Sequence, residues 1–206
     1  MLVMNLLAAE PGPVETVPIF PLATVLYPGM RLPLKIFETR YMDMAKACLK
    51  HDAAFGVCLI REGEEVGTPA VPEAVGCLAR IGEWDMEALG VLKVKAEGLE
   101  RFRLIATKTT ASGLILGDIE RIPAEEAVVA PELAQSASFV SKVVEALGPA
   151  RFAGPYRYDD ASWVGFRLAE ILPLRNAVKQ KLLELTDPGA RLAILHRVLR
   201  EQNLLG

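Results

Sequence analysis

The sequence is poor in the residues that most often bind metals or act as nucleophiles and bases. Only two histidines and three cysteines occur among its 206 residues, and Cys48, Cys58 and Cys77 form no C-x-x-C pair. A structural zinc site needs about four such ligands at short spacing. We therefore expect no bound metal, and we expect the three thiols to be buried and reduced.

Motifs of nucleotide-driven and hydrolytic enzymes are also missing. No G-x-x-x-x-G-K-[ST] occurs, so the chain has no loop of backbone amides and lysine to hold nucleotide phosphates. No serine lies in a G-x-S-x-G turn, and His51 and His196 are the only histidines available for a catalytic triad. We expect a protein that is not an enzyme and has no cofactor.

The sequence has no excess of positive charge and no recognisable leader. Its 23 basic and 26 acidic residues give a net charge of −3, which argues against nucleic acid as a main partner. The apolar residues 1–9 lack a basic flank and are far shorter than the ~20 residues that span a bilayer. We expect residues 1–13 to be a tail and the protein to be cytoplasmic, with no membrane contact.

Short alternating segments dominate residues 14–123. The clearest are 31–37, 91–96 and 101–105, in which apolar residues occupy every second position, as in strands with one buried face. Gly and Pro separate these segments, a pattern typical of a barrel or a sandwich. Residues 38–51 instead repeat their apolar positions with helical spacing, and we expect this helix to cap the sheet.

The apolar period changes to about 3.6 in residues 130–206, which predicts four helices. Asp159 or Asp160 is placed to cap the second of them, and Asp187 to cap the last, with Pro188 at its first position. The third helix is expected to bury a stripe made of Leu174, Val178, Leu182 and Leu185. The fold class is thus α+β, with a β-rich lobe before a helical lobe.

Three stretches, in order along the chain, resemble a single family. The first runs from Pro18 to Tyr41 and contains P-I-F-P-L, Y-P-G and I-F-E; the second contains Gly98 followed by E-R-F at 100–102. The third contains L-P-L and K-Q-K-L-L-E at 179–184. Together they resemble the N-terminal, substrate-binding domain of Lon proteases, from about residue 14 to residue 199.

The resemblance implies a PUA-like β pseudobarrel with a capping helix, followed by a four-helix lobe. It also implies a role, because in Lon this domain recognises polypeptide substrates and delivers them to an attached ATPase ring. The sequence shows no counterpart of that ATPase or of the Ser-Lys protease segment. The resemblance thus implies a stand-alone, non-catalytic module for protein quality control, whose partners are unfolded or damaged polypeptides and a protease or chaperone.

Unfolded chains are recognised through exposed apolar side chains, so candidates for peptide binding are apolar or aromatic residues near expected turns and strand ends. Four of these are Tyr27, Met30, Trp84 and Met86. Each has a core position as its alternative, which we favour for Trp84. A second candidate surface is a loop that combines aromatics with arginine. Its residues are Tyr156, Arg157 and Tyr158.

Glu38, Arg40, Tyr41 and Arg101 are the polar members of the matched stretches. One interpretation makes them a clamp on a substrate backbone. The other makes Glu38 and an arginine a partly buried pair that locks the capping helix onto the barrel, and we favour this structural role.

Two further functions stay open. PUA-like barrels occur in RNA-modifying proteins, although the acidic balance argues against RNA binding. A cleft between the barrel and the helices is also a common place for a small-molecule pocket.

Overall fold

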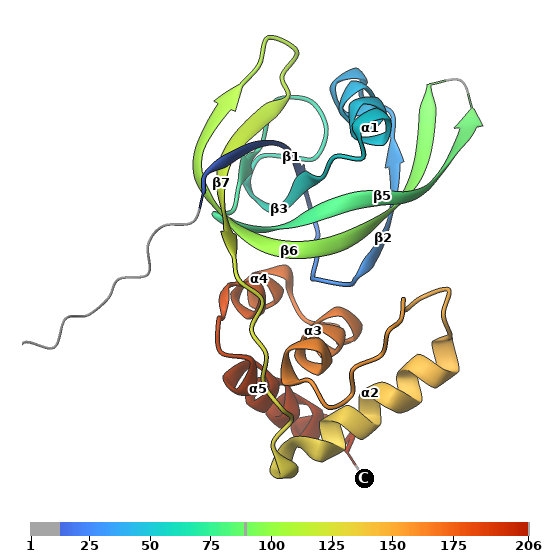
Figure 1. Cartoon of the computed structure of the whole chain (residues 1–206), viewed down its shortest axis with the longest axis vertical. Coiled ribbons are helices and arrows are strands. Elements are labelled where there is room, and N and C mark those ends of the chain that lie inside the picture. The colour runs from blue at the N-terminus through green and yellow to red at the C-terminus, as the bar shows by residue number, and fades with distance from the viewer. Residues whose placement is uncertain (1–12, 89, 206) are drawn as a thin grey trace, which may run out of the picture.

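The computed structural model describes residues 13–88 and 90–205. A β lobe lies above a helical lobe, and the chain crosses from one to the other after the last strand (Figure 1). The tail expected at residues 1–13 falls almost entirely outside the described residues.

Seven strands form the β lobe in the described part of the chain. They are β1 (Glu15–Leu22), β2 (Arg31–Ile36), β3 (Phe55–Glu62), β4 (Val71–Pro72), β5 (Val75–Ala88), β6 (Val91–Thr109) and β7 (Ile115–Ile122). The sheet order is β1-β7-β6-β5-β3-β4, and β1 also pairs in parallel with β3. This second pairing of β1 closes the sheet into a barrel, with β2 and β4 outside the closed ring.

A small apolar cluster contributed by five strands includes Ile19, Leu78, Phe102 and Ile119, each with no exposed surface. Gly56 and Gly76 lie against the ring of Phe102, where an added Cβ would come within 2.7 and 2.6 Å of it. The glycines therefore leave the space that this phenylalanine occupies.

Helix α1 (Thr39–His51) follows β2, as the helical spacing of residues 38–51 predicts. It buries Tyr41, Met44, Ala45 and Cys48, and the ring of Tyr41 stacks on Phe20 at a centroid distance of 4.1 Å. The apolar stripe of the helix thus packs onto the barrel.

Four α-helices form the second lobe within the described residues, after a short 3-10 turn at Pro131–Leu133. They are α2 (Ala134–Leu147), α3 (Ala161–Ile171), α4 (Asn176–Glu184) and α5 (Pro188–Glu201). Residues 161–170 of α3 are all buried, which makes α3 the central helix of the lobe. The stripe expected for α4 is wrong at Val178, which is exposed, because Gln180 and Leu183 face the interior in its place.

Side chains that donate to backbone carbonyls join the two lobes. Tyr27 donates its hydroxyl to Lys179 O (2.9 Å), and Gln180 donates its amide to Val75 O (3.0 Å). Arg167 of α3 donates to Gly29 O and Pro28 O in the turn before β2, both at 2.7 Å. Hydrogen bonds from charged donors are the stronger kind, so the lobes are held in one arrangement.

Candidate functional site

The outer parts of β5 and β6 extend beyond the barrel, where β6 pairs with β5 on one side and with β2 on the other (Figure 1). In this three-stranded extension Leu34 lies opposite Val94, and Val94 lies opposite Trp84. The register therefore places one apolar residue of each strand in a single row. Trp84 is 58% exposed and Met86, two residues further along β5, is 47% exposed.

A groove of about 520 Å³ runs over this row, and we call it the Trp84 groove. It is lined by Pro33, Leu34, Lys35, Glu83, Trp84, Asp85, Lys93, Val94 and Lys95. Its charged walls are partly neutralised, since Lys95 Nζ lies 2.6 Å from Glu83 Oε2. An apolar floor with charged walls suits a polypeptide that carries both apolar and polar side chains.

A second groove, of about 310 Å³, lies on the other side of β2, and we call it the Phe37 groove. Its lining is mainly apolar and includes Phe20, Leu22, Leu34, Phe37 and Val66. Phe37 is 57% exposed, a large apolar surface that the sequence analysis did not single out. The sequence contained a signal for this exposure. In the alternating segment 31–37, Phe37 falls on the same side of the strand as the polar positions and not on the side of the buried ones.

The structure separates the four apolar candidates into two pairs. Tyr27 has no exposed surface and Met30 is 9% exposed, so neither side chain is displayed for a peptide to contact. Tyr27 is buried because it packs against Phe166 of the helical lobe, at a ring distance of 5.7 Å. The core position favoured for Trp84 is wrong, since β5 carries Trp84 beyond the barrel and its side chain is exposed there.

Tyr156 and Tyr158 lie in the helical lobe and not beside the Trp84 groove. Their rings are 6.0 Å apart, and Tyr158 meets Trp163 edge-on at 5.3 Å. Tyr156 also donates its hydroxyl to Phe152 O at 3.3 Å. These rings form an aromatic cluster that packs the 152–158 loop against the start of α3.

Glu38 and Arg40 form an ion pair of 2.9 Å at the start of α1. Arg40 also donates to Gly113 O in the turn between β6 and β7, at 3.1 Å, and its guanidinium lies 4.7 Å from the centroid of the Tyr41 ring. These contacts join the capping helix to the barrel, as the structural interpretation of Glu38 and an arginine expects.

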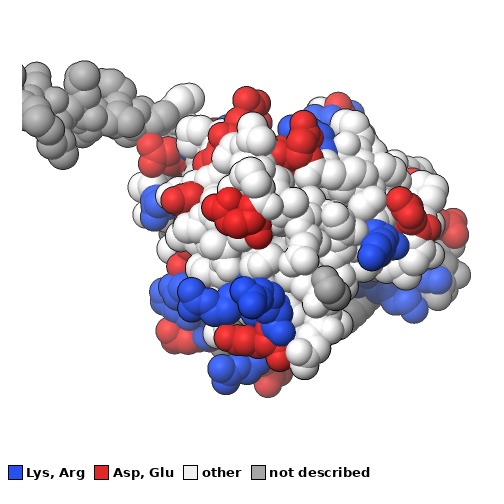
Figure 2. Space-filling view, turned by 90° about the horizontal axis from the view of Figure 1, so that it is seen from below, with Lys and Arg blue, Asp and Glu red and all other residues white. Residues whose placement is uncertain are grey.

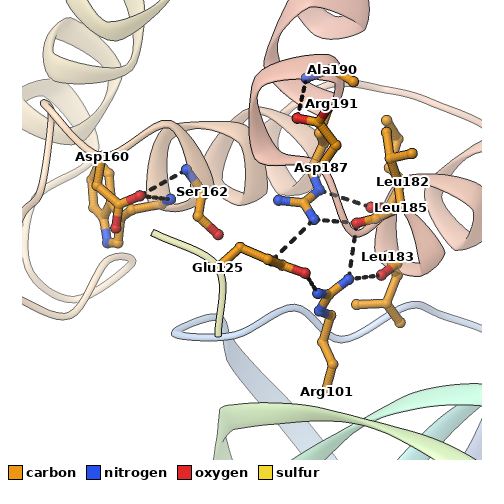
Figure 3. Close-up of polar contacts among 11 residues, drawn as sticks. Arg101, Glu125, Asp160, Ser162, Leu182, Leu183, Leu185, Asp187, Ala190 and Arg191 are labelled. Atoms are coloured by element: carbon orange, nitrogen blue, oxygen red, sulfur yellow. Dashed lines mark hydrogen bonds and ion pairs between the residues drawn. The ribbon is translucent and has the colours of Figure 1, made fainter. Parts of the chain in front are cut away.

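Arg101 and Arg191 meet at a shared carboxylate between the lobes (Figure 3). Arg101 of β6 forms an ion pair with Glu125, and the other oxygen of that carboxylate lies 3.6 Å from Arg191 of α5. Burial and, for Arg101, the neighbouring charge of Arg191 lower the pKa of each guanidinium to about 10. Both arginines therefore stay charged at neutral pH. Both donate to carbonyl oxygens within the protein, whereas Nη1 of Arg191 is buried without a hydrogen-bond partner among the described residues.

A pocket of about 260 Å³ lies next to this ion-pair cluster. Its polar lining includes Arg101, Glu125, Asp160 and Ser162. The side chains of Arg101, Glu125 and Asp160 already have intramolecular partners. Arg101 is paired with Glu125, and Asp160 accepts from the backbone N–H of Ser162. The pocket is smaller than the roughly 300–1,000 Å³ typical of small-molecule sites, so its geometry does not favour a ligand.

The underside of the helical lobe shows no single sign of charge (Figure 2). Uncharged residues cover much of this view, and basic side chains gather at one margin with acidic side chains beside them. An apolar groove of about 620 Å³ lies between α2 and residues 204–205. Mixed charge of this kind does not make the basic stripe that a nucleic-acid interface uses.

The three cysteines are buried, and burial raises the pKa of each thiol, that of Cys77 to about 12. Within residues 13–88 and 90–205, no group of three or more metal-binding side chains comes together. The helices of the described residues are all too short or too polar to cross a bilayer.

Comparison with known proteins finds similar chains among Lon proteases and cereblons. Lon protease of Escherichia coli K12 is 26% identical over 196 residues, which cover 90% of this chain and 25% of the relative. Protein cereblon of Danio rerio is 30% identical over 114 residues, which cover 53% of this chain and 26% of the relative. The chain thus spans about a quarter of the length of these relatives.

Solved structures of the same kind share its fold. The Lon N-terminal domain protein of Xanthomonas campestris superposes with a TM-score of 0.74 at 34% identity, covering 88% of this chain and 96% of that one. The N-terminal domain of a Mycobacterium avium complex Lon protease superposes with a TM-score of 0.61 at 21% identity, with the same coverage. The model of the ATP-dependent protease La (LON) substrate-binding domain matches residues 16–201. The chain therefore belongs to this LON substrate-binding domain family.

Proposed function

We propose that this protein is a non-catalytic module that holds exposed apolar segments of unfolded or damaged polypeptides at the Trp84 groove. The observation that carries the proposal is the exposure of Trp84 and Met86 on strands that extend beyond the barrel, over an apolar groove. Tryptophan is enriched among the residues that dominate binding energy in protein interfaces. The family assignment supports polypeptide as the ligand.

In the cell we propose that the module works in the cytoplasm as an adaptor, which presents its clients to a protease or a chaperone. The module contributes recognition, because the match covers a substrate-binding domain. Unfolding and cleavage of a client are the work of the partner.

The test uses a fluorescently labelled protein that is reduced and carboxymethylated, so that it cannot refold. We expect saturable binding by fluorescence anisotropy, and we expect Trp84→Ala to weaken it by about tenfold or more, since an interface hot spot contributes about 2 kcal/mol or more. Trp84 is largely exposed, so the variant should fold normally.

Ile194→Ala is the matched control, because Ile194 is an exposed apolar residue of α5 in the other lobe. Its binding should equal that of the unchanged protein. No saturable binding, or equal binding by Trp84→Ala and Ile194→Ala, would contradict the proposal.

A further inference from the structure

Helix α2 has a second apolar stripe besides the one that packs into the helical lobe. Its buried residues are Ser136, Val140 and Val144. Another set of α2 residues, spaced by three and four positions, shares a different face of the helix. This set lines the groove of about 620 Å³ beside residues 204–205, which we call the α2 groove. The set includes Ser138, Phe139, Lys142, Val143, Ala146 and Leu147.

The second stripe is open to solvent in the described part of the chain. Leu147 is 54% exposed, and Leu204, which lines the groove from the other side, is 42% exposed. Helix α2 lies at the bottom of Figure 1, and Figure 2 shows uncharged residues over much of this side of the molecule. A helix that is apolar on two faces normally has both of them covered. The helical spacing of the stripe suits a second helix laid along it.

The charges of this face are complementary to those of a second copy of the chain. Lys142 and Glu145 are the only charged residues of α2. Within residues 13–88 and 90–205 neither forms an ion pair, and Glu145 accepts a hydrogen bond from Ser141 at 3.2 Å. If two α2 helices lie antiparallel about a two-fold axis near Val143, Lys142 of each copy comes within one turn of Glu145 of the other. The same axis therefore makes two equivalent ion pairs.

We propose that a second copy of this chain covers the α2 groove, with its own α2 antiparallel to the first, in a two-fold dimer. A two-fold interface brings the same surface of both copies together, so each stripe covers the other. The inference goes beyond the proposed function and does not depend on it. The α2 groove lies in the helical lobe and the Trp84 groove on strands of the β lobe (Figure 1), so the pairing leaves both Trp84 grooves open.

Sedimentation equilibrium of the full chain tests the dimer. Between about 1 and about 200 μM the average mass should rise from that of one chain toward that of two, as mass action requires. A single-chain mass over the whole range would overturn the proposal.

Reversal of the two charges tests the arrangement of the copies. Lys142→Glu and Glu145→Lys each place like charges across the axis, so each variant alone should dimerise at least about tenfold more weakly. An equimolar mixture of the two variants restores opposite charges at both contacts, so it should pair about as tightly as the unchanged protein. Both positions are exposed, so the variants should fold.

Lys46→Glu is the control for these reversals, because it makes the same change at an exposed position of α1. Its dimerisation should equal that of the unchanged protein. Equal weakening by Lys46→Glu and Lys142→Glu, or no recovery in the mixture, would overturn the antiparallel pairing.

A change of one apolar residue separates a second copy from a client as the occupant. Leu147→Ser should weaken dimerisation by about tenfold or more, whereas Val128→Ser, at an apolar position that is 83% exposed outside the α2 groove, should not. If the chain stayed single and Leu147→Ser instead weakened binding of the carboxymethylated protein, the α2 groove would take clients. That result would overturn the proposal of a second copy.

Discussion

Arg101 donates a hydrogen bond of 2.6 Å to the carbonyl oxygen of Leu183 and thereby ties the longest strand to helix α4. The same guanidinium donates to Leu185 O at 3.0 Å and pairs with Glu125 in the segment between the lobes (Figure 3). One side chain thus donates hydrogen bonds to carbonyl oxygens at the end of a helix and neutralises a carboxylate of the connecting segment. Together with the hydrogen bonds of Tyr27, Gln180 and Arg167, it holds the two lobes in their relative placement.

Replacement of this side chain should destabilise the whole molecule. Arg101→Met keeps the apolar stem and removes all three contacts, which leaves the carboxylate of Glu125 and two carbonyl oxygens with fewer partners. We expect the free energy of unfolding to fall by about 3–5 kcal/mol, the usual result of breaking a buried ion pair. Urea unfolding followed by circular dichroism measures it.

Lys46→Met provides the comparison, because Lys46 is an exposed residue of α1 whose ion-pair distance to Asp43 is 3.9 Å. Its effect should stay within about 0.5 kcal/mol. Similar effects of the two methionine variants would show that the contacts of Arg101 add little to stability.

The cap of α3 gives a smaller and more local prediction. Asp160 accepts hydrogen bonds from Ser162 N at 2.8 Å and Trp163 N at 3.3 Å, which occupy two donors at the helix start. Asp160→Ala should cost about 1 kcal/mol, with a range of roughly 0.5–2 kcal/mol. Asp159→Ala, at the exposed neighbouring position, should leave the unfolding midpoint unchanged. If Asp159→Ala lost more stability than Asp160→Ala, the assignment of the cap to Asp160 would be wrong.

Helix starts and the buried faces of strands could be predicted from the sequence, because neighbouring residues determine them. Asp187 caps α5 and accepts from Ala190 N at 3.0 Å, with Pro188 at the first position, as the Thr-Asp-Pro restart predicts. Alternation at 91–96 predicts the buried Leu92, Val94 and Ala96. The mixed α+β class and its resemblance to Lon domains are confirmed by the superposed structures. The PUA-like description stays a prediction.

The candidate site was harder to predict, since exposure depends on packing between distant segments. Tyr27 lies in a turn that looks exposed in the sequence, but Arg167 of α3, some 140 residues later, binds that turn and covers it. Trp84 differs from the prediction in the opposite direction: a core position was expected, but the length of β5 carries the side chain beyond the barrel. The alternation of residues within a strand does not reveal how far that strand extends beyond a barrel.

The buried thiols predict a dependence of stability on alkaline pH. Burial raises the pKa of Cys77 from 9.0 to about 12, so the folded protein keeps a proton that the unfolded chain releases. The raised pKa in the folded state stabilises the folded protein, and this contribution to the free energy of unfolding is fully present below pH 9. It is lost as the pH rises from about 9 to about 12. The slope reaches about 1.4 kcal/mol per pH unit for one thiol.

Urea unfolding between pH 8 and 10 measures this slope, and Cys77→Ala should make it shallower. A thiol reagent offers a second readout at pH 8, where the native thiols should react slowly and those of the unfolded chain rapidly. Rapid reaction of Cys77 in the native protein would contradict its burial.

Gly98 lies in the E-G-L-E-R-F stretch at 97–102, which resembles the Lon family, and its close contacts allow a specific prediction about stability. Its N–H donates to Met30 O at 2.9 Å, and its carbonyl accepts from Gly29 N at 2.7 Å, so β6 lies directly against the turn before β2. A Cβ at this position would come within 2.1 Å of Tyr27 O, a backbone atom that cannot rotate away.

Gly98→Ala should therefore separate β6 from this turn and cost about 3 kcal/mol or more, at the upper end of overpacking effects. Gly82→Ala is the matched change, because its Cβ would meet only Lys95 O, at an ordinary 3.7 Å. We expect the unfolding midpoint of Gly82→Ala to stay close to that of the unchanged protein. Equal midpoints for the two alanine variants would mean that the close approach of Tyr27 and Gly98 does not hold in solution.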